Sequence, residues 1–262
     1  MNFPTVLLLG FIAGATILLG LPVGRIKRPA ESLRVLLAAS ATGVLLFLVW
    51  DVLSAAWKPI DALLSSKSDP LLLGGYSALF LAGLAVGLLG ITALQGVVAR
   101  RTRTAGVESA PNPRRLALFI AIGIGLHNFA EGLAIGQSAA VGEIGLATVL
   151  VIGFALHNAT EGFGIVGPLV GSETRPSWGF LLLLGLIGGG PTFVGTLIGW
   201  TFVSPPLSIL FLALAAGSII FVIIQLMGML SRPRRGDLVG YGILLGLVAG
   251  FATDAILTAA GA

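Results

Sequence analysis

Residues 116–170 read LALFIAIGIGLHNFAEGLAIGQSAAVGEIGLATVLVIGFALHNATEGFGIVGPLV, and this stretch holds two long apolar runs separated by a very short turn. Each run exceeds the roughly 20 residues that a helix needs to cross the hydrocarbon core of a bilayer. A connection this short makes the two helices antiparallel neighbours. The stretch therefore predicts a helical hairpin across a membrane, with its turn near residues 141–145.

The rest of the chain repeats this apolar pattern. Of its 262 residues, 56% are hydrophobic and only 10% are charged, less than half the charge content of an ordinary soluble domain. This composition excludes a soluble enzyme, a disordered tail and a disulfide scaffold. We expect an all-α integral membrane protein whose single transmembrane domain, residues 1–262, has eight helices at about 3–24, 35–57, 71–99, 116–141, 144–170, 178–203, 207–230 and 238–260.

The basic residues indicate how the helices are oriented. No Lys or Arg precedes the first apolar run, so this run lacks the charged start of a signal peptide and is expected to remain as a helix. With eight alternating spans, thirteen Lys and Arg fall on one side, and only Lys58 and Lys67 fall on the other. We therefore expect both termini outside the cytoplasm and a cytoplasmic loop at 100–115. This orientation accounts for the net charge of +4, so no nucleic-acid partner is expected.

The chain has two histidines, His127 and His157, and each begins the same motif, HNxxEG. Positions i, i+1 and i+4 share one face of a helix. In an antiparallel pair with its turn centred at residue 144, His127 lies level with Glu161, and Glu131 lies level with His157. Two imidazoles and two carboxylates can therefore converge near the middle of the bilayer. The asparagines that follow the histidines, Asn128 and Asn158, would add amide oxygens.

These ligand types point to a divalent metal ion. A charged side chain at the bilayer centre costs roughly 3 kcal/mol on insertion scales, so it is expected to serve a function. Imidazole and carboxylate ligands without Cys suit Zn²⁺, Fe²⁺, Mn²⁺, Co²⁺ or Cd²⁺. The HExxH and ExxH patterns of zinc proteases and di-iron proteins are absent. We therefore expect neither an enzyme nor an organic cofactor. A helix-packing hydrogen bond between His and Glu is the alternative without metal.

Other polar residues within the spans leave two interpretations open. Asp51, near the outer end of the second predicted span, is either a ligand at the mouth of the cation pathway or an ordinary helix-end residue. Asp254, Gln95 and Gln225 are either pathway residues or hydrogen-bonding residues between helices. Glu143, in the turn of the hairpin, is expected to be solvated.

The sequence resembles the ZIP family of divalent metal transporters, in particular its GufA-like bacterial branch. The resemblance rests on the motifs GLHNFAEGLAIG at 125–136, ALHNATEGFGIVGPL at 155–169 and GLIGGGPTFVGT at 185–196. It implies eight helices in which spans one to three repeat, inverted, as spans six to eight around spans four and five. It also implies a primary metal site at His127, Glu131, His157 and Glu161, and a second site at Asn128 and Asn158 bridged by the two glutamates. Some relatives add a carboxylate from the sixth helix, whereas the run Gly188–Thr192 has none.

The resemblance further implies a function. A protein of this family in a bacterial inner membrane would carry a divalent cation, Zn²⁺ in the first place, into the cytoplasm by alternating access. A metal- or proton-selective channel that uses the same residues is the first alternative, and a membrane metalloenzyme is the second. The expected partners are the metal ion and the lipid bilayer, and a homodimer is left open.

Overall fold

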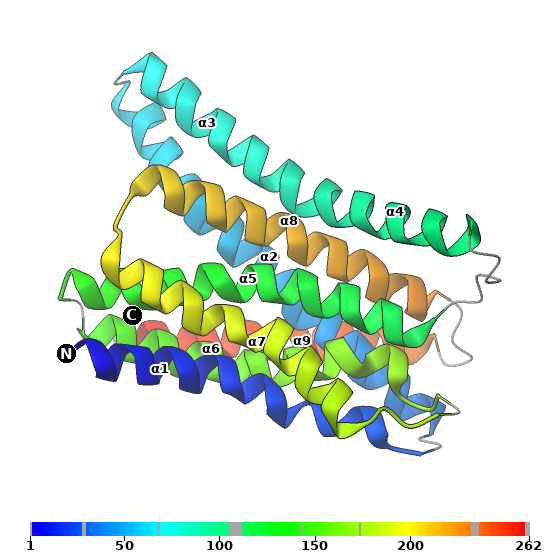
Figure 1. Ribbon diagram of the computed structural model, residues 1–262. Coiled ribbons are helices and arrows are strands. Elements are labelled where there is room, and N and C mark those ends of the chain that lie inside the picture. The colour runs from blue at the N-terminus through cyan, green and yellow to red at the C-terminus, as the bar shows by residue number, and fades with distance from the viewer. Residues whose placement is uncertain are drawn as a thin grey trace.

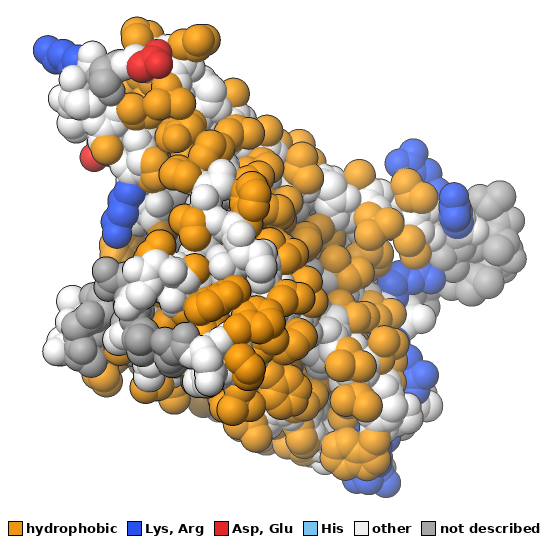
Figure 2. Space-filling view, turned by 60° about the vertical axis from the view of Figure 1, so that its left-hand side comes forward, with side chains coloured by type: hydrophobic (Ala, Val, Ile, Leu, Met, Phe, Trp, Pro, Cys, Tyr) orange, Lys and Arg blue, Asp and Glu red, His pale blue; other side chains and the backbone are white. Residues whose placement is uncertain are grey.

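The computed structural model describes residues 2–27, 30–67, 69–104, 112–142, 144–172, 174–231 and 236–259. Among these residues all regular structure is helical (Figure 1). Eight of the helical segments are long and apolar enough to cross a membrane. The prediction of an all-α protein with eight candidate spans is therefore confirmed. On the face shown in Figure 2, hydrophobic side chains cover the middle, and most of the visible Lys and Arg side chains lie toward the ends.

The spans follow one another along the bundle, alternating in direction. The first combines α1 (Phe3–Ala15) with the short 3₁₀ helices η1 (Thr16–Leu19) and η2 (Leu21–Arg25). The third combines α3 (Pro70–Ala85), the π-helical segment η3 (Val86–Gly90) and α4 (Ile91–Thr104). The other helices are α2 (Glu31–Ser66), α5 (Pro113–Ala140), α6 (Ile144–Val166) followed by η4 (Gly167–Leu169), α7 (Trp178–Thr201), α8 (Pro205–Leu230) and α9 (Asp237–Ala259).

The local sequence explains where helix α5 begins. The side-chain oxygen of Asn112 accepts hydrogen bonds from the backbone amides of Arg114 at 3.0 Å and Arg115 at 3.3 Å. Pro113 occupies the first helical position, where the missing N–H costs nothing because no intrahelical partner exists there. The same combination of cap and proline, Asp69 followed by Pro70, starts α3.

Helix α2 differs from the prediction because it extends well beyond residues 35–57. It runs from Glu31 to Ser66, with Pro59 inside it. Lys58 and Asp61 are exposed on this helix, so their charges do not require the helix to end. Asp51 was expected near the end of its helix, but it lies well inside α2. At about 1.5 Å per residue it lies roughly 22 Å from Ser66, the last residue of α2.

The loop predicted at 100–115 is also shorter than expected, because α4 continues to Thr104 and α5 begins at Pro113. Residues 105–111 lie outside the described part of the chain, as do Arg28, Glu143, Arg232, Arg234 and Arg235. Most of the described basic residues lie at the end of the bundle where α4 ends and α5 begins (Figure 1), here termed the basic end: Arg25, Lys27, Arg34, Arg100, Arg101, Arg114, Arg115 and Arg175. The opposite end, where α1 begins and α9 ends, is termed the terminal end.

Helix α5 lies at the centre of the bundle, in contact with α6, α7 and α8. Glycines allow α5 and α7 to approach closely. A Cβ at Gly125 would collide with the backbone of Ile187, and one at Gly136 would lie only 2.6 Å from the backbone nitrogen of Trp200. Small residues at helix contacts stabilise membrane bundles because they maximise van der Waals packing. Helices α1 and α6 flank this pair, and together these four helices surround the polar centre.

Candidate metal site

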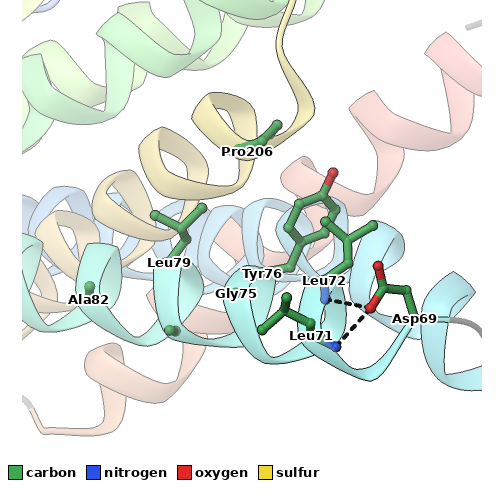
Figure 3. Close-up of a pocket in the computed structure, with 9 residues that line it drawn as sticks. Asp69, Leu71, Leu72, Gly75, Tyr76, Leu79, Ala82 and Pro206 are labelled. Atoms are coloured by element: carbon green, nitrogen blue, oxygen red, sulfur yellow. Dashed lines mark hydrogen bonds between the residues drawn. The ribbon is translucent and has the colours of Figure 1, made fainter.

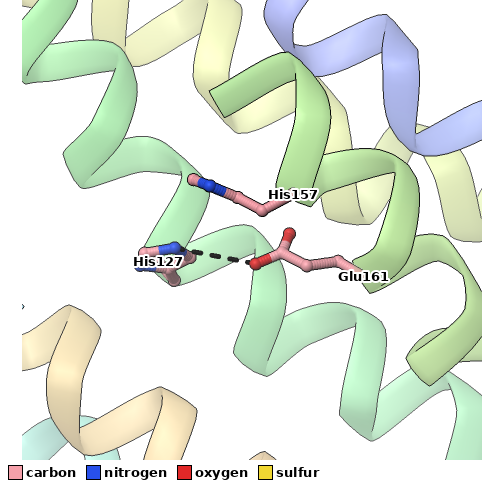
Figure 4. Close-up of side chains that lie close together, drawn as sticks. All are labelled: His127, His157 and Glu161. Atoms are coloured by element: carbon pink, nitrogen blue, oxygen red, sulfur yellow. Dashed lines mark ion pairs between the residues drawn. The ribbon is translucent and has the colours of Figure 1, made fainter. Parts of the chain in front are cut away.

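The polar centre lies where the two HNxxEG motifs meet. His127 extends from α5, and His157 and Glu161 extend from α6, so that their polar atoms point toward one another (Figure 4). One ligand atom from each of these three side chains lies within 4.8 Å of the other two. Such spacing allows one ion to contact all three groups.

Glu131 of α5 joins the two histidines. Its Oε1 atom contacts the Nε2 atom of His157 and lies 3.0 Å from the Nε2 atom of His127. His127 Nε2 also lies 3.6 Å from Glu161 Oε1. The two level pairs expected from the position of the turn, His127 with Glu161 and Glu131 with His157, are thus both in contact.

The cluster is deeply buried. His127 is 1% exposed, Glu131 is 5% exposed and Glu161 is 2% exposed, whereas His157 is only partly buried. Ionised carboxylates in such surroundings are costly unless positive charge neutralises them. A divalent cation or protons on the histidines can supply that charge.

Each motif asparagine is held by a neighbouring helix. The side-chain amide of Asn128 donates to the carbonyl oxygen of Gly188 in α7 at 2.9 Å, and that of Asn158 donates to Ala13 in α1 at 3.1 Å. Because a backbone carbonyl can only accept, the NH₂ group of each amide must face it. The amide oxygens are consequently left over, and neither has a hydrogen-bond partner.

Unpartnered polar atoms gather in this cluster. Among the described residues, most buried side-chain nitrogen and oxygen atoms without a hydrogen-bond partner belong to the motif residues His127, Asn128, Glu131, Asn158 and Glu161. Buried polar groups in folded proteins are nearly always hydrogen-bonded. Their concentration here indicates a set of donor atoms that can hold a ligand, and the atom types are those that bind borderline divalent cations.

A cavity of about 490 Å³ reaches this cluster from the side of α2 and α9. Its wall includes His157 and Thr160 of α6, together with Asp51, Lys58 and Asp254. The interpretation of Asp51 as a residue of the pathway therefore has a geometric basis, and the same holds for Asp254. Both aspartates lie about five helical turns from the basic end. This shared depth could have been read from the sequence and would have indicated that the two side chains lie at the same level of the bundle.

Gln95 and Gln225 lie elsewhere. The Gln95 amide donates to the side-chain oxygen of Gln225 at 3.3 Å and thereby connects α4 with α8. Neither residue lines the cavity beside His157. Of the two interpretations left open for this pair, a hydrogen bond between helices fits the structure.

Isoleucines fill the space on the other side of the cluster. Ile17 of η1, Ile124 of α5 and Ile165 of α6 are each fully buried. A Cβ at Gly188 of α7 would lie 2.9 Å from Ile17, 2.9 Å from Ile165 and 3.9 Å from Ile124, so the three side chains meet at one point. This isoleucine layer lies one helical turn from Asn128 and Glu161, toward the basic end.

A larger groove, of about 630 Å³, lies between α3 and α8 (Figure 3). Its lining is apolar apart from Tyr76 and Asp69. The Asp69 carboxylate accepts hydrogen bonds from the amides of Leu71 at 2.9 Å and Leu72 at 3.3 Å, and so caps α3. The groove therefore has a structural carboxylate but no cluster of metal ligands.

Comparison with protein-family models and with curated proteins finds no match to this chain. The resemblance to the ZIP family rests on the motifs themselves.

Proposed function

We propose that this protein transports a divalent metal cation across a membrane, with Zn²⁺ as the first candidate, as its resemblance to the ZIP family implies. The observation that carries the proposal is the convergence of two imidazoles and two carboxylates in the buried centre of a bundle with eight candidate spans. Ionisable residues at such depth are rare and typically mark an ion pathway. We place the basic end in the cytoplasm, both termini outside it and the protein in a bacterial inner membrane.

The ligand set suits a transported ion. Neutral imidazole and carboxylate bind borderline cations, and without thiolates the Irving–Williams order governs their relative affinity. That order does not by itself select Zn²⁺, so Fe²⁺, Mn²⁺, Co²⁺ and Cd²⁺ are further substrates to test. Two carboxylates, Glu131 and Glu161, balance the charge of one divalent ion.

The surroundings of the site support alternating access. The cavity beside His157 approaches the site from the side of α2 and α9, while the isoleucine layer fills the space toward the basic end. A cation that reaches the site could leave into the cytoplasm only after this layer opens. A carrier cycle includes such a step, whereas a channel requires one continuous pathway.

The contacts of the two motifs also support an inverted repeat. Asn128 of α5 donates to Gly188 of α7, as Asn158 of α6 donates to Ala13 of α1. Each motif glycine lies against the backbone of the same partner helix or its continuation: Gly132 against Thr192, and Gly162 against Ile17. Helix α5 thus contacts α7, the sixth span, in the same way that α6 contacts the first span. This relation is expected if spans one to three are repeated, inverted, as spans six to eight.

Uptake of Zn²⁺ into liposomes that contain the purified protein tests the proposal. The wild type should give saturable uptake, and Glu161→Gln should take up Zn²⁺ much more slowly because the variant removes a charged ligand. The matched control is Asp61→Asn, which neutralises an exposed carboxylate on α2 and should transport normally. Uptake that never saturates would favour the channel. Equal uptake by Glu161→Gln and Asp61→Asn would show that Glu161 is not needed for transport, which would contradict the proposed site.

A further inference from the structure

A lysine lines the cavity that leads to the metal site. Lys58 of α2 belongs to the wall of this cavity together with Asp51 and Asp254. Among the residues that the structure describes, no other Lys or Arg lines it. A positive charge repels an approaching cation, so a lysine at this place is unexpected in the path of a divalent metal ion.

Lys58 lies in the outer part of the cavity. It follows Asp51 by seven residues, which is about two helical turns, so both side chains lie on the same face of α2. Lys58 is exposed, whereas Asp51, Asp254 and His157 are partly buried. Because α2 runs from the basic end to the terminal end (Figure 1), a cation that enters from the terminal end passes Lys58 roughly 10 Å before it reaches Asp51.

The charge of Lys58 acts inside the cavity. Its ammonium group interacts electrostatically with the Asp51 carboxylate, which also interacts with Asp254 and His157. No described residue forms a direct ion pair with Lys58, so its charge is not bound to one partner. The ammonium group therefore offsets part of the attraction that the two aspartates of the wall exert on a cation.

A lysine at a membrane surface can also serve packing alone. Its apolar stem covers hydrophobic surface while its ammonium group stays in water. Lys67 is of this ordinary kind, because it is exposed directly after the last turn of α2 and does not line the cavity. The two lysines differ in their access to the cavity, and Lys67 is therefore the matched control for Lys58.

We propose that Lys58 is a specificity-determining residue at the entrance of the pathway. Its ammonium group repels entering cations and offsets the attraction of Asp51 and Asp254. The inference rests on the proposed function. Because the Coulomb energy is proportional to the charge of the ion, Lys58 weakens the binding of divalent cations at the entrance more than that of monovalent ions. Weak binding at an entrance allows an ion to move on to the deeper site.

Uptake of Zn²⁺ into liposomes tests the proposal with Lys58→Met, which keeps the apolar stem and removes the charge. This variant should lower the Zn²⁺ concentration at half-maximal uptake by about two- to fivefold, and Lys67→Met should leave it unchanged. Increasing the salt from about 0.01 M to about 1 M on both sides shortens the screening length from about 30 Å to about 3 Å, so the difference between Lys58→Met and the wild type should vanish. An unchanged or higher half-maximal concentration for Lys58→Met, or an equal decrease for Lys67→Met, overturns the inference.

Chemical modification separates the charge of the side chain from its size. The chain has no natural cysteine, so the thiol of Lys58→Cys can be modified selectively. A methanethiosulfonate reagent with a trimethylammonium group restores a positive charge and should return the half-maximal concentration to the wild-type value. A reagent of similar size with a sulfonate group should instead lower it below the value of unmodified Lys58→Cys. The same shift with both reagents would mean that size rather than charge matters, and it would overturn the inference.

A second measurement does not depend on transport. Thr160→Cys places a thiol in the cavity wall, and the ratio of its modification rates with the cationic and the anionic reagent reports the local potential. Adding Lys58→Met should increase this ratio by about two- to tenfold, and adding Lys67→Met should not. If the wild type takes up no divalent cation although the ratio increases, the proposed function is wrong and the effect of Lys58 on the cavity stands. If the wild type takes up Zn²⁺ saturably and the ratio is unchanged, only the role of Lys58 is wrong.

Discussion

The two copies of the HNxxEG motif differ in their surroundings although their residues are nearly the same. On α5, His127 and Ala130 are 1% and 3% exposed, and the helix lies closely against α7. On α6, the equivalent residues His157 and Thr160 are only partly buried and line the cavity. The sequence of the motif therefore supplies the same polar side chains twice, whereas its place in the bundle decides which copy faces the cavity. We infer that a cation meets the α6 copy first and that the α5 copy holds the fixed half of the site.

The largest effect should come from the carboxylate that both histidines share. Glu131 Oε1 contacts both Nε2 atoms, whereas Glu161 Oε1 forms its ion pair with His127, at the longer distance of 3.6 Å. Glu131→Gln should therefore reduce the initial rate of Zn²⁺ uptake by at least about a hundredfold, beyond the losses typical of residues that only support a metal ligand. The rate is measured in proteoliposomes, and Glu161→Gln should retain more activity. The reverse order would show that the α6 copy provides the central ligand.

The motif glycines should show what the two copies have in common. A Cβ at Gly132 would collide with the backbone of Thr192, and one at Gly162 would collide with that of Ile17. Gly132→Ala and Gly162→Ala should each lower the free energy of unfolding by about 1–3 kcal/mol, the usual cost of overpacking. The corresponding fall in melting temperature is measured in detergent.

Gly164→Ala is the matched control for the glycine variants. Its Cβ would meet its nearest neighbour, the Cβ of Ala41, at 3.7 Å, which is ordinary van der Waals contact. Because alanine also favours a helix, this change should leave the protein as stable as the wild type or make it more stable. Equal destabilisation by all three variants would mean that the close helix contacts at the motifs are not the cause.

The pairing across the site followed from the sequence because helix geometry and a short turn determine it. The i, i+4 spacing sets the face of each helix, and the turn near residue 144 sets the level, so Glu131 and His157 could be matched by position alone. The length of α2 could not be predicted in this way. Pro59 and its charged neighbours resemble a helix end, but the helix continues to Ser66, so Asp51 lies well inside the helix, in the wall of the cavity.

The contacts that other helices make with the motif asparagines could not be predicted from the sequence either. The groups that orient Asn128 and Asn158 are the backbone carbonyls of Gly188 and Ala13. A carbonyl group is present at every residue, so no side-chain type marks these two. They also lie far along the chain from the asparagines, and only the tertiary fold brings them there.

Cysteine labelling can sharpen the contrast between the buried and the accessible copy, since the chain contains no natural cysteine. Thr160→Cys and Ala130→Cys occupy equivalent positions of the two motifs. A water-soluble methanethiosulfonate reagent should modify Thr160→Cys at least about tenfold faster, because reactivity requires access to the thiolate. Zn²⁺ should slow this reaction. Similar rates at both positions would contradict the view that only the α6 copy faces the cavity.

The smallest effect should come from Asp51, which lines the cavity without belonging to the metal centre. Its electrostatic neighbours include Asp254, His157 and Lys58. One carboxylate near the path of a cation can stabilise the cation there by roughly 1 kcal/mol. Asp51→Asn should therefore raise the Zn²⁺ concentration at half-maximal uptake by about two- to fivefold. The maximal rate should change little, because the ligands at the motifs remain. Asp61→Asn removes the same charge from the exposed surface of α2 and should change neither quantity. If Asp51→Asn instead abolishes uptake at saturating Zn²⁺, Asp51 is part of the site itself, and the α6 copy is not the first place where the cation is bound.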